Sequence, residues 1–355
     1  MEQLTELPII DCTKINITLD DAEIDDNDLR EFGEDIFESF KRYDVTSAVL
    51  TNHGISEEVV KAAERVTSEL EKPDFKKIAP YFAPMKLGEE FQRKCDIHID
   101  GEDGGIVKHS FATKHGVQLL TKKLMLLKKD KSGDTFNPEN GRTLRFVPSL
   151  AQVSVLNIDD IIPGFNKAYN ALFCESLKLA KRVLTALTFP LHTDRDYFNK
   201  MIEDIHTPGE NGSALRGNIL PKVPQDFPID DQVVRINEHE DRSIITILHQ
   251  ANVNGLTVKT MSGKSVPVVH KGDSLLLQTG NILARLTSGK LPPTPHSVMG
   301  NKEQLQQSRI SHAFLIFPDE KVELRCIDGS DTYPPVSAFI LLNDLENQDL
   351  HGLKH

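Results

Sequence analysis

Two histidines and one aspartate have the residue types and the order of a metal-binding set. His239 and Asp241 lie two residues apart, and His296 follows after several predicted strands. If the chain around His239 is extended, side chains two residues apart face the same side, so the imidazole and the carboxylate point together. Two histidines and one carboxylate on one side of a metal leave its other positions open, as in non-haem iron(II) sites. We therefore predict that His239, Asp241 and His296 bind iron(II) and form the catalytic centre.

A second polar pair, Arg309 and Ser311, lies on a later apolar run that ends at residues 314–317. An arginine that points into a β framework needs an anionic partner, because a buried charge without one is costly. The planar guanidinium binds a carboxylate through two hydrogen bonds, and the serine hydroxyl adds another donor. We predict that this pair binds an organic acid whose other end contacts the metal.

Other interpretations of these residues stay open. A single His-x-Asp pair occurs by chance, and zinc also accepts two histidines and a carboxylate. The H-E-x-x-H motif of zinc peptidases is absent, because Ser243 stands where its second histidine would be. The order of His-x-Asp, distant histidine and Arg-x-Ser, each in an apparent β context, favours iron. We interpret His249 and His270 as structural or surface residues.

The composition is that of a soluble globular protein, with 355 residues of which 39% are hydrophobic and 26% charged. The formal net charge of -12 argues against a nucleic-acid partner, because binding phosphates needs a basic face. An apolar run long enough to span a membrane is absent, and residues 1–10 lack the basic start of a signal peptide. The four cysteines are far apart without a C-x-x-C pair, which predicts a reducing compartment, and we expect the cytoplasm.

The first part of the chain mixes helices with two strands and has no glycine-rich phosphate loop, so dinucleotide binding is not supported. The predicted elements are a strand at 7–11, a helix at 27–43, a strand at 46–50, a helix that Ser56 begins as its N-cap, and a long helix at 165–189. The apolar stripe of this last helix predicts a core position rather than chemistry. Residues 94–115 are rich in glycine and are a candidate lid.

From residue 214 the chain changes to short β runs separated by turns. The runs are 215–220, 232–237, 243–249, 256–260, 266–269, 274–278, 284–287 and 310–317, and an apolar segment at 336–345 predicts a final helix on the outside. Many short strands at this spacing predict a sandwich or jelly roll. We divide the chain into an N-terminal region (1–205), a jelly-roll region (206–320) and a C-terminal helical extension (321–355), which together form one globular unit.

Several short motifs lie along most of the chain in one order. They are Leu7-Pro8-Ile9-Ile10-Asp11, Asn52-His53-Gly54, His239-Glu240-Asp241, Gly255-Leu256, Gly272-Asp273, His296-Ser297-Val298 and Arg309-Ile310-Ser311. In these motifs the chain resembles the isopenicillin N synthase-like branch of the 2-oxoglutarate- and iron(II)-dependent dioxygenases, which includes plant gibberellin oxidases. The resemblance implies a mixed α/β fold, with a double-stranded β-helix core (jelly roll, cupin-like) flanked by helices.

The resemblance also implies the ligands: Fe(II), 2-oxoglutarate as co-substrate, and O2. By that resemblance Arg309 and Ser311 hold the distal carboxylate of 2-oxoglutarate. The family's N-Y-Y-P motif is here Asn218-Ile219-Leu220-Pro221. Asn218 is kept as a co-substrate residue, whereas Leu220 replaces a tyrosine that can touch the co-substrate. Co-substrate binding would then depend more on Arg309, Ser311 and Asn218.

The implied activity is oxidation of an unactivated C–H bond of a small molecule by hydroxylation, desaturation or ring closure, coupled to conversion of 2-oxoglutarate to succinate. Two alternatives stay open: a 2-oxoglutarate-independent Fe(II) oxidase whose Arg309 and Ser311 bind the main substrate, and a non-catalytic binding module of the same fold. Arg235, Asn237 and Phe314 are the candidate substrate contacts, with a surface ion pair as the other interpretation of Arg235. We expect a monomer that acts in small-molecule biosynthesis, without nucleic-acid or membrane partners.

Overall fold

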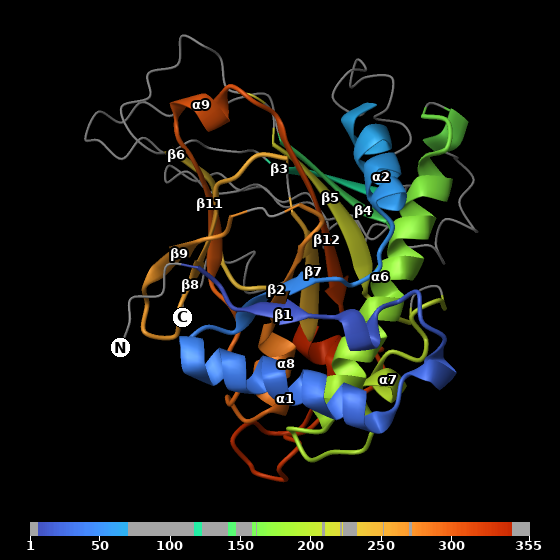
Figure 1. Cartoon of the computed structure of the whole chain (residues 1–355), viewed down its shortest axis with the longest axis vertical. Helices are drawn as coiled ribbons and strands as arrows, with labels where there is room; N and C mark the ends of the chain where they lie inside the picture. Colours follow the sequence, from blue (N-terminus) through green and yellow to red (C-terminus); the bar gives the residue numbers. More distant parts are fainter. Residues whose placement is uncertain are drawn as a thin grey trace, which may run out of the picture.

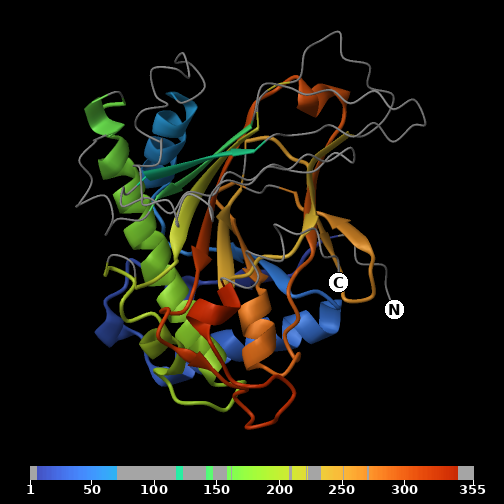
Figure 2. The same cartoon turned by 180° about the vertical axis from the view of Figure 1, so that it is seen from behind.

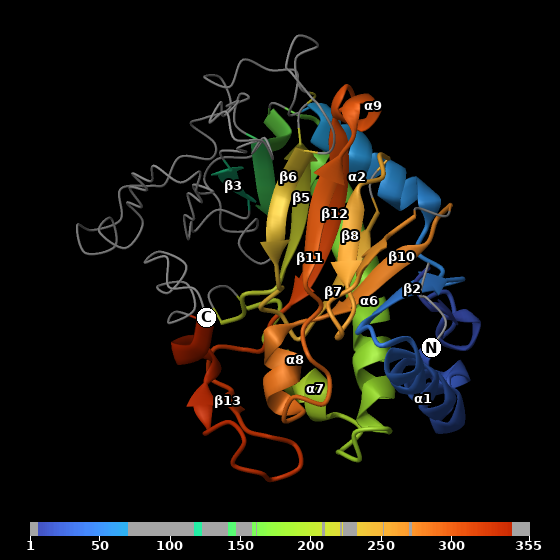
Figure 3. The ribbon, with the colours of Figure 1, turned by 90° about the vertical axis from the view of Figure 1, so that its left-hand side faces the viewer.

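Two β-sheets face one another in the computed structural model, which describes residues 6–69, 117–122, 141–146, 158–160, 162–207, 210–220, 222, 233–250, 252–269 and 272–342. The larger sheet has the order β1 (Ile9–Asp11), β2 (Ser47–Thr51), β10 (Leu275–Thr279), β7 (Ile245–His249), β12 (Arg309–Ile316), β5 (Ala214–Leu220), β4 (Gly141–Phe146), β3 (Val117–Lys122). The smaller sheet has the order β6 (Val233–His239), β11 (His296–Gly300), β8 (Leu256–Lys259), β9 (Ser265–Pro267). Figure 3 shows the smaller sheet in front, with β6 and β11 side by side.

The space between the sheets is filled by branched apolar side chains from both. This cluster includes Val49, Leu248 and Leu276 from the larger sheet and Val258 and Val298 from the smaller one. Successive side chains of a strand point to opposite faces of the sheet, so one face of each sheet can carry apolar side chains while the other face carries a different set. The result is a sandwich of two facing sheets, and the predicted double-stranded β-helix fold is confirmed.

The outer face of the larger sheet is covered by helices, as Figure 1 shows for α6 and α2 beside β5 and β12. The helices are α1 (Asp26–Tyr43), α2 (Glu57–Glu69), α6 (Phe165–Thr188), α7 (Tyr197–Met201), α8 (Asn281–Leu286) and α9 (Lys302–Leu305), with short 3-10 turns η1 (Thr13–Ile15), η2 (Asp21–Glu23) and η3 (Ile158–Asp160). The ring of Phe173 in α6 packs edge-to-face on Phe314 of β12, with 4.9 Å between the ring centroids. Helix α6 is therefore the core helix that the apolar stripe predicts.

Capping explains where α1 begins and ends. The Asp25 side chain accepts hydrogen bonds from the backbone N–H groups of Asn27 and Asp28, both 2.8 Å, and so caps the start of the helix. At the other end Asp44 adopts a left-handed conformation, with φ at 56°, after Lys41 and Arg42 in the last turn. The helix predicted for 27–43 is confirmed within one residue.

The structure corrects two of the predicted elements. The run at 284–287 is not a strand, because residues Asn281–Leu286 form α8, whose buried Ile282, Leu283 and Leu286 lie on one helical face. The segment from 336 is not helical from its start: β14 (Val336–Ser337) pairs with β13 (Glu323–Leu324), and a helix follows at 338–342. Figure 2 shows α8 and this C-terminal part at the lower end of the sandwich.

Strands from the N-terminal region complete the larger sheet. β1 pairs in parallel with β2, and β2 pairs antiparallel with β10. This edge combines strands of the N-terminal and jelly-roll regions, and Leu324 and Ala338 of the C-terminal extension belong to the main core cluster. We therefore propose that the three regions predicted from the sequence fold as one unit. Among the described residues, we find no helix that is both long and apolar enough to cross a membrane.

A buried polar network links the larger sheet to α2 and α6. The Thr67 hydroxyl donates to the carbonyl of Ala63, and accepts from Tyr169 Oη at 2.6 Å and His312 Nε2 at 2.9 Å. His249, which lies opposite His312 on the neighbouring strand, contacts the Ser176 hydroxyl at 2.9 Å. Burial lowers the pKa of His312 to about 4, and it also lowers the pKa of His249 well below the ordinary value of 6.5. Both imidazoles are therefore neutral in the folded protein near pH 7.

We expect these histidines to make the protein less stable in acid. Above about pH 6.5 His312 is neutral in both the folded and the unfolded chain, so it adds no pH dependence. As the pH falls from about 6.5 to about 4, the unfolded chain takes up a proton that folded His312 does not, and the free energy of unfolding drops by up to about 3 kcal/mol. Urea unfolding across this range measures the drop.

The matched variants for this test are His312→Gln and His192→Asn. The first removes the titrating group, so its stability should fall less between pH 6.5 and 4 than that of the wild type. His192 is exposed and should leave the pH dependence unchanged. If His312→Gln keeps the full acid-induced loss, the assignment to His312 is wrong.

Candidate metal centre

The pairing of β6 with β11 brings the two predicted histidine ligands together. His239 and His296 are register partners, and their ring centroids lie 4.2 Å apart. Asp241 follows directly after β6, and the ligand atoms of the three side chains all lie within 4.8 Å of one another. The three residues that the sequence singles out thus form one cluster, contributed by neighbouring strands of the smaller sheet (Figure 3).

Backbone carbonyls orient both imidazoles. His239 Nδ1 donates to the carbonyl of Asn237 at 2.9 Å, and His296 Nδ1 donates to the carbonyl of Thr294 at 3.0 Å. With the proton on Nδ1, the lone pair of Nε2 is available to a metal. Thr294 is itself fixed, because its hydroxyl donates to the carbonyl of Thr46 at 2.6 Å. The hydrogen bond from Nδ1 of each imidazole to a backbone carbonyl therefore selects the tautomer that a metal ligand needs.

Asp241 is oriented by a residue of the other sheet. The Thr246 hydroxyl, on β7, donates to Asp241 Oδ2 at 2.6 Å. Burial raises the pKa of the Asp241 carboxyl, but His296, His239, the Thr246 hydroxyl and the charge of Arg216 together hold that pKa below its usual value. Asp241 is therefore a carboxylate near pH 7. Two imidazole nitrogens and one carboxylate oxygen within mutual reach are a donor set that fits iron(II).

Arg309 lies buried on the inward face of β12, with 3% of its surface exposed. Its Nε donates to the carbonyl of Val253 at 3.1 Å, and its Nη1 donates to the Ser311 hydroxyl at 3.2 Å. Asn218 is the register partner of Ser311 on β5, so its side chain belongs to the same face of the sheet. Within the part of the chain that the structure describes, no carboxylate forms an ion pair with Arg309. Burial, with Arg235 as a further cause, lowers the pKa of Arg309 to about 9, so it remains a cation.

The three predicted substrate contacts lie in different places. Arg235 is buried, and its Nη2 donates to the carbonyl of Leu220 at 2.8 Å. Asn237 has an exposed side chain, as His239 two residues further along the chain also has. Phe314 faces α6 on the opposite side of the larger sheet from Ser311. Phe314 is therefore turned away from the metal-binding cluster, whereas Asn237 stays a predicted substrate contact.

Sequence reasoning missed Thr246, Thr294 and Arg216. Thr246 could have been found, since it lies in the strand predicted for 243–249 directly after the His-x-Asp pair. Thr294 acts through its backbone carbonyl, which no residue type reveals. Arg216 lies two residues before Asn218 on β5 and shares its face, but only the structure shows that its charge acts on Asp241. The candidate lid at 94–115 and His270 lie outside the described residues.

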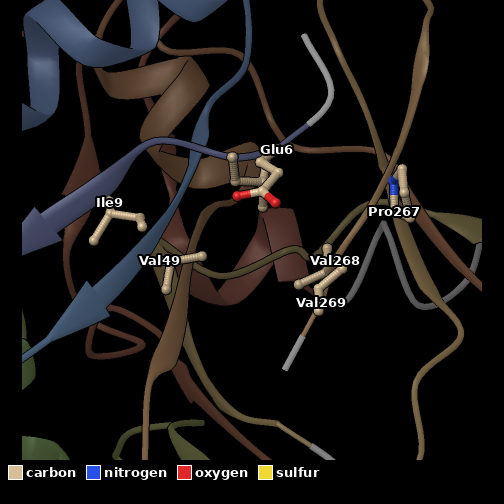
Figure 4. Close-up of a pocket in the computed structure, with 7 residues that line it drawn as sticks. Glu6, Ile9, Val49, Pro267, Val268 and Val269 are labelled. Carbon is tan, nitrogen blue, oxygen red and sulfur yellow. The ribbon is translucent and has the colours of Figure 1, made fainter. Parts of the chain in front are cut away.

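A small pocket lies at the edge of the sandwich, with a volume of about 10 Å³. Figure 4 shows its lining, with Ile9 and Val49 on β1 and β2, Val268 and Val269 after β9, and Glu6 as the charged residue among them. This volume holds about one water molecule, and none of the predicted site residues lines it. The pocket is therefore separate from the metal-binding cluster.

Comparison with known proteins identifies the family that part of the chain matches. Residues 211–318 match the 2OG-Fe(II) oxygenase superfamily, and this range contains all three predicted metal ligands and the Arg309–Ser311 pair. The chain carries a 2OG-Fe(II) oxygenase domain. The predicted resemblance to 2-oxoglutarate- and iron(II)-dependent dioxygenases is thus confirmed, as are the cofactors expected of that family.

Two curated relatives and one solved structure give the extent of the similarity. The 2-oxoglutarate-dependent dioxygenase ecdK of Aspergillus rugulosus is 26% identical over 48% of this chain and 52% of its own length. Gibberellin 20 oxidase 2 of Arabidopsis thaliana is 26% identical over 88% of this chain and 71% of its own length. A 2OG-Fe(II) oxygenase family structure from Caulobacter crescentus has a TM-score of 0.64 at 20% identity, covering 99% of this chain and 100% of that one. The structural similarity thus covers the fold of the whole chain, whereas the sequence match to ecdK spans about half of that relative.

The Thr246 hydrogen bond predicts a defect in metal binding. Thr246→Val removes the bond that orients Asp241 while keeping the size and shape of the side chain. Loss of such an outer contact typically lowers metal affinity by roughly 10- to 100-fold. Competition with a coloured chelator for Mn(II) measures the affinity. Thr257→Val, on β8 of the smaller sheet, is the control, and an equal loss in both variants would contradict the assignment.

Proposed function

We propose that this protein is a 2-oxoglutarate-dependent iron(II) oxygenase that oxidises an unactivated C–H bond of a small molecule. The observation that carries the proposal is the pairing of two sites inside one sandwich. One is the cluster of His239, Asp241 and His296, and the other is the buried Arg309 without a carboxylate partner among the described residues. An acid that chelates the metal at one end and carries a second carboxylate would contact both sites: its chelating end would bind the metal, and its second carboxylate would pair with Arg309.

Each residue has a definite task in this proposal. His239, His296 and Asp241 hold the metal on one side, and Asn237, Thr294 and Thr246 keep those ligands in their binding orientation. Arg309, Ser311 and Asn218 bind the far carboxylate of 2-oxoglutarate and so fix which end reaches the metal. The chemistry that bound iron(II) supplies is activation of dioxygen, coupled to conversion of 2-oxoglutarate to succinate and carbon dioxide.

Two features of the chain bear on its state in the cell. Cys12, Cys174 and Cys326 are free thiols in the described part of the chain, which supports a reducing compartment, and we propose the cytoplasm. The net charge of -12 opposes self-association, and we propose a monomer, which light scattering on the purified protein checks. A role in small-molecule biosynthesis is the biological setting that fits this activity.

The decisive test is succinate release from iron-loaded protein that receives 2-oxoglutarate and then air. We expect slow turnover without added substrate, and we expect His239→Ala to abolish it because one of three metal ligands is lost. His192→Asn should keep the wild-type rate, since this exposed histidine lies outside the cluster. Succinate from His239→Ala at the wild-type rate would contradict the proposed metal site.

The same test separates the alternative functions. A protein that consumes dioxygen without needing 2-oxoglutarate would be an iron(II) oxidase that binds its main substrate at Arg309. Activity restored by zinc rather than iron would indicate a hydrolase. A protein that binds 2-oxoglutarate but releases no succinate with any C–H substrate would be a binding module.

Arg309 predicts a defect in co-substrate binding that does not depend on turnover. Arg309→Met removes the buried cation, and we expect the affinity for 2-oxoglutarate to fall by roughly 10- to 100-fold, as for loss of a charge-assisted hydrogen-bonded pair. Calorimetric titration of the Mn(II)-loaded protein measures this loss. An unchanged dissociation constant would mean that Arg309 does not hold the co-substrate.

A further inference from the structure

The chain holds the three proposed metal ligands in two different ways. His239 and His296 lie within β6 and β11, and the pairing of these strands fixes both residues. Asp241 lies beyond the end of β6, in residues 240–244, which cross from the smaller sheet to β7 of the larger sheet. This crossing segment belongs to no strand or helix, so its backbone groups need partners from elsewhere. Those partners decide where the Asp241 carboxylate begins.

The junction between β10 and α8 supplies these partners. Three consecutive N–H groups of the junction donate to three carbonyls of the crossing segment. The hydrogen bonds run from Gly280 to Ile244 at 3.0 Å, from Asn281 to Asp241 at 2.8 Å and from Ile282 to Ser243 at 3.2 Å. The first N–H groups of a helix have no acceptor inside the helix, and the N-cap residue of α8 makes no side-chain cap hydrogen bond. The start of α8 and the crossing segment therefore satisfy each other.

The side chain of Asn281 adds a fourth hydrogen bond. Its Nδ2 donates at 2.8 Å to Oε2 of Glu240, the residue between the two ligands His239 and Asp241. Asn281 thus holds Glu240 through its side chain and Asp241 through its backbone N–H. Two successive residues held by one neighbour restrict the rotation of the chain at the point where the Asp241 side chain leaves it.

The contact between the junction and the crossing segment is so close that it requires glycine at 280. A Cβ atom added to Gly280 would lie 2.0 Å from the carbonyl oxygen of Ser243 and 2.7 Å from its carbonyl carbon. The φ of Gly280 is -114°, an extended conformation open to any residue, so the close approach and not the dihedral angle demands glycine. A backbone carbonyl cannot swing aside as a flexible side chain can. A larger residue at 280 would therefore push the crossing segment away from α8.

We propose that Gly280 and Asn281 are positioning residues of the metal site, which hold the crossing segment so that the Asp241 carboxylate stays beside the two imidazoles. The proposal rests on the proposed function, because it takes the cluster to bind a metal. It divides the placement of Asp241 between two sources: the β10–α8 junction holds its backbone, and Thr246 holds its carboxylate.

The first test compares two glycine substitutions with the same steric effect. Gly33→Ala is the matched control, because a Cβ atom on Gly33 would lie 2.0 Å from the carbonyl oxygen of Ala186, where α1 packs on α6. Both Gly280→Ala and Gly33→Ala should lower the unfolding temperature. Only Gly280→Ala should weaken Mn(II) binding, by roughly 10- to 100-fold, as for loss of other groups that orient metal ligands. Competition with a coloured chelator measures the affinity, at a temperature where circular dichroism shows both variants folded.

The second test applies even if Gly280→Ala does not fold. Asn281→Ala keeps the backbone N–H and removes only the bond to Glu240, so we expect a smaller loss of Mn(II) affinity, roughly 10-fold. Glu240→Ala and the double variant complete a cycle. Because both single variants break the same hydrogen bond, the loss in the double variant should be smaller than the sum of the two single losses.

Three results would overturn the proposal. Wild-type Mn(II) affinity in folded Gly280→Ala and in Asn281→Ala would mean that the junction does not position Asp241. A loss in Gly33→Ala as large as that in Gly280→Ala would mean that affinity follows overall stability. Strictly additive losses in the cycle would exclude an action of Asn281 through Glu240.

Failure of the underlying function gives a different result. If the wild-type protein does not bind Mn(II), the proposed function fails before any variant is compared. If the wild type binds Mn(II) and the iron-loaded protein releases succinate, while the junction variants match it in affinity, the function stands and only the role of Gly280 and Asn281 is wrong.

Discussion

The antiparallel pairing of β6 with β11 is the constraint on which the site depends, because it places His239 directly opposite His296. Side chains of directly opposed residues lie close enough to bind one ion, whereas a shift of one residue would turn one histidine to the other face of the sheet. Other groups orient the two imidazoles and the carboxylate of Asp241. Carbonyls of Asn237 and Thr294 select the tautomers, and Thr246 reaches across from the larger sheet to hold Asp241.

The two sheets divide the charges of the site between them. The smaller sheet supplies the proposed metal ligands and Arg235, and the larger sheet supplies Arg309, Ser311 and the Thr246 hydroxyl. Between these polar groups the facing side chains are apolar, which keeps the local dielectric low and makes each charge act strongly on its neighbours. A linear acid matches this division, because its chelating end can bind a metal at the smaller sheet while its carboxylate end pairs with Arg309 of the larger sheet.

Residue types and their spacing were enough to predict that His239, Asp241 and His296 come together, that Arg309 points into the β framework, and where most strands lie. The reason is local: a period of two predicts strands, and a stripe of large apolar residues predicts α6. What failed depends on non-local geometry. Phe314 was assigned to the site although its neighbour Ala313 has the inward position, and α8 formed where a short apolar run also fits a strand.

The interleaved order of the larger sheet has a consequence for synthesis on the ribosome. Strand β2 is made early, yet one of its two neighbours is β10, whose Leu275 pairs with Leu50. Until that strand has emerged, the edge of β2 and the apolar face beneath it stay exposed. Such distant contacts make folding slow and leave nascent chains prone to aggregation. The N-terminal region therefore has to wait for most of the chain, and cellular yield should depend on chaperones that protect it in the meantime.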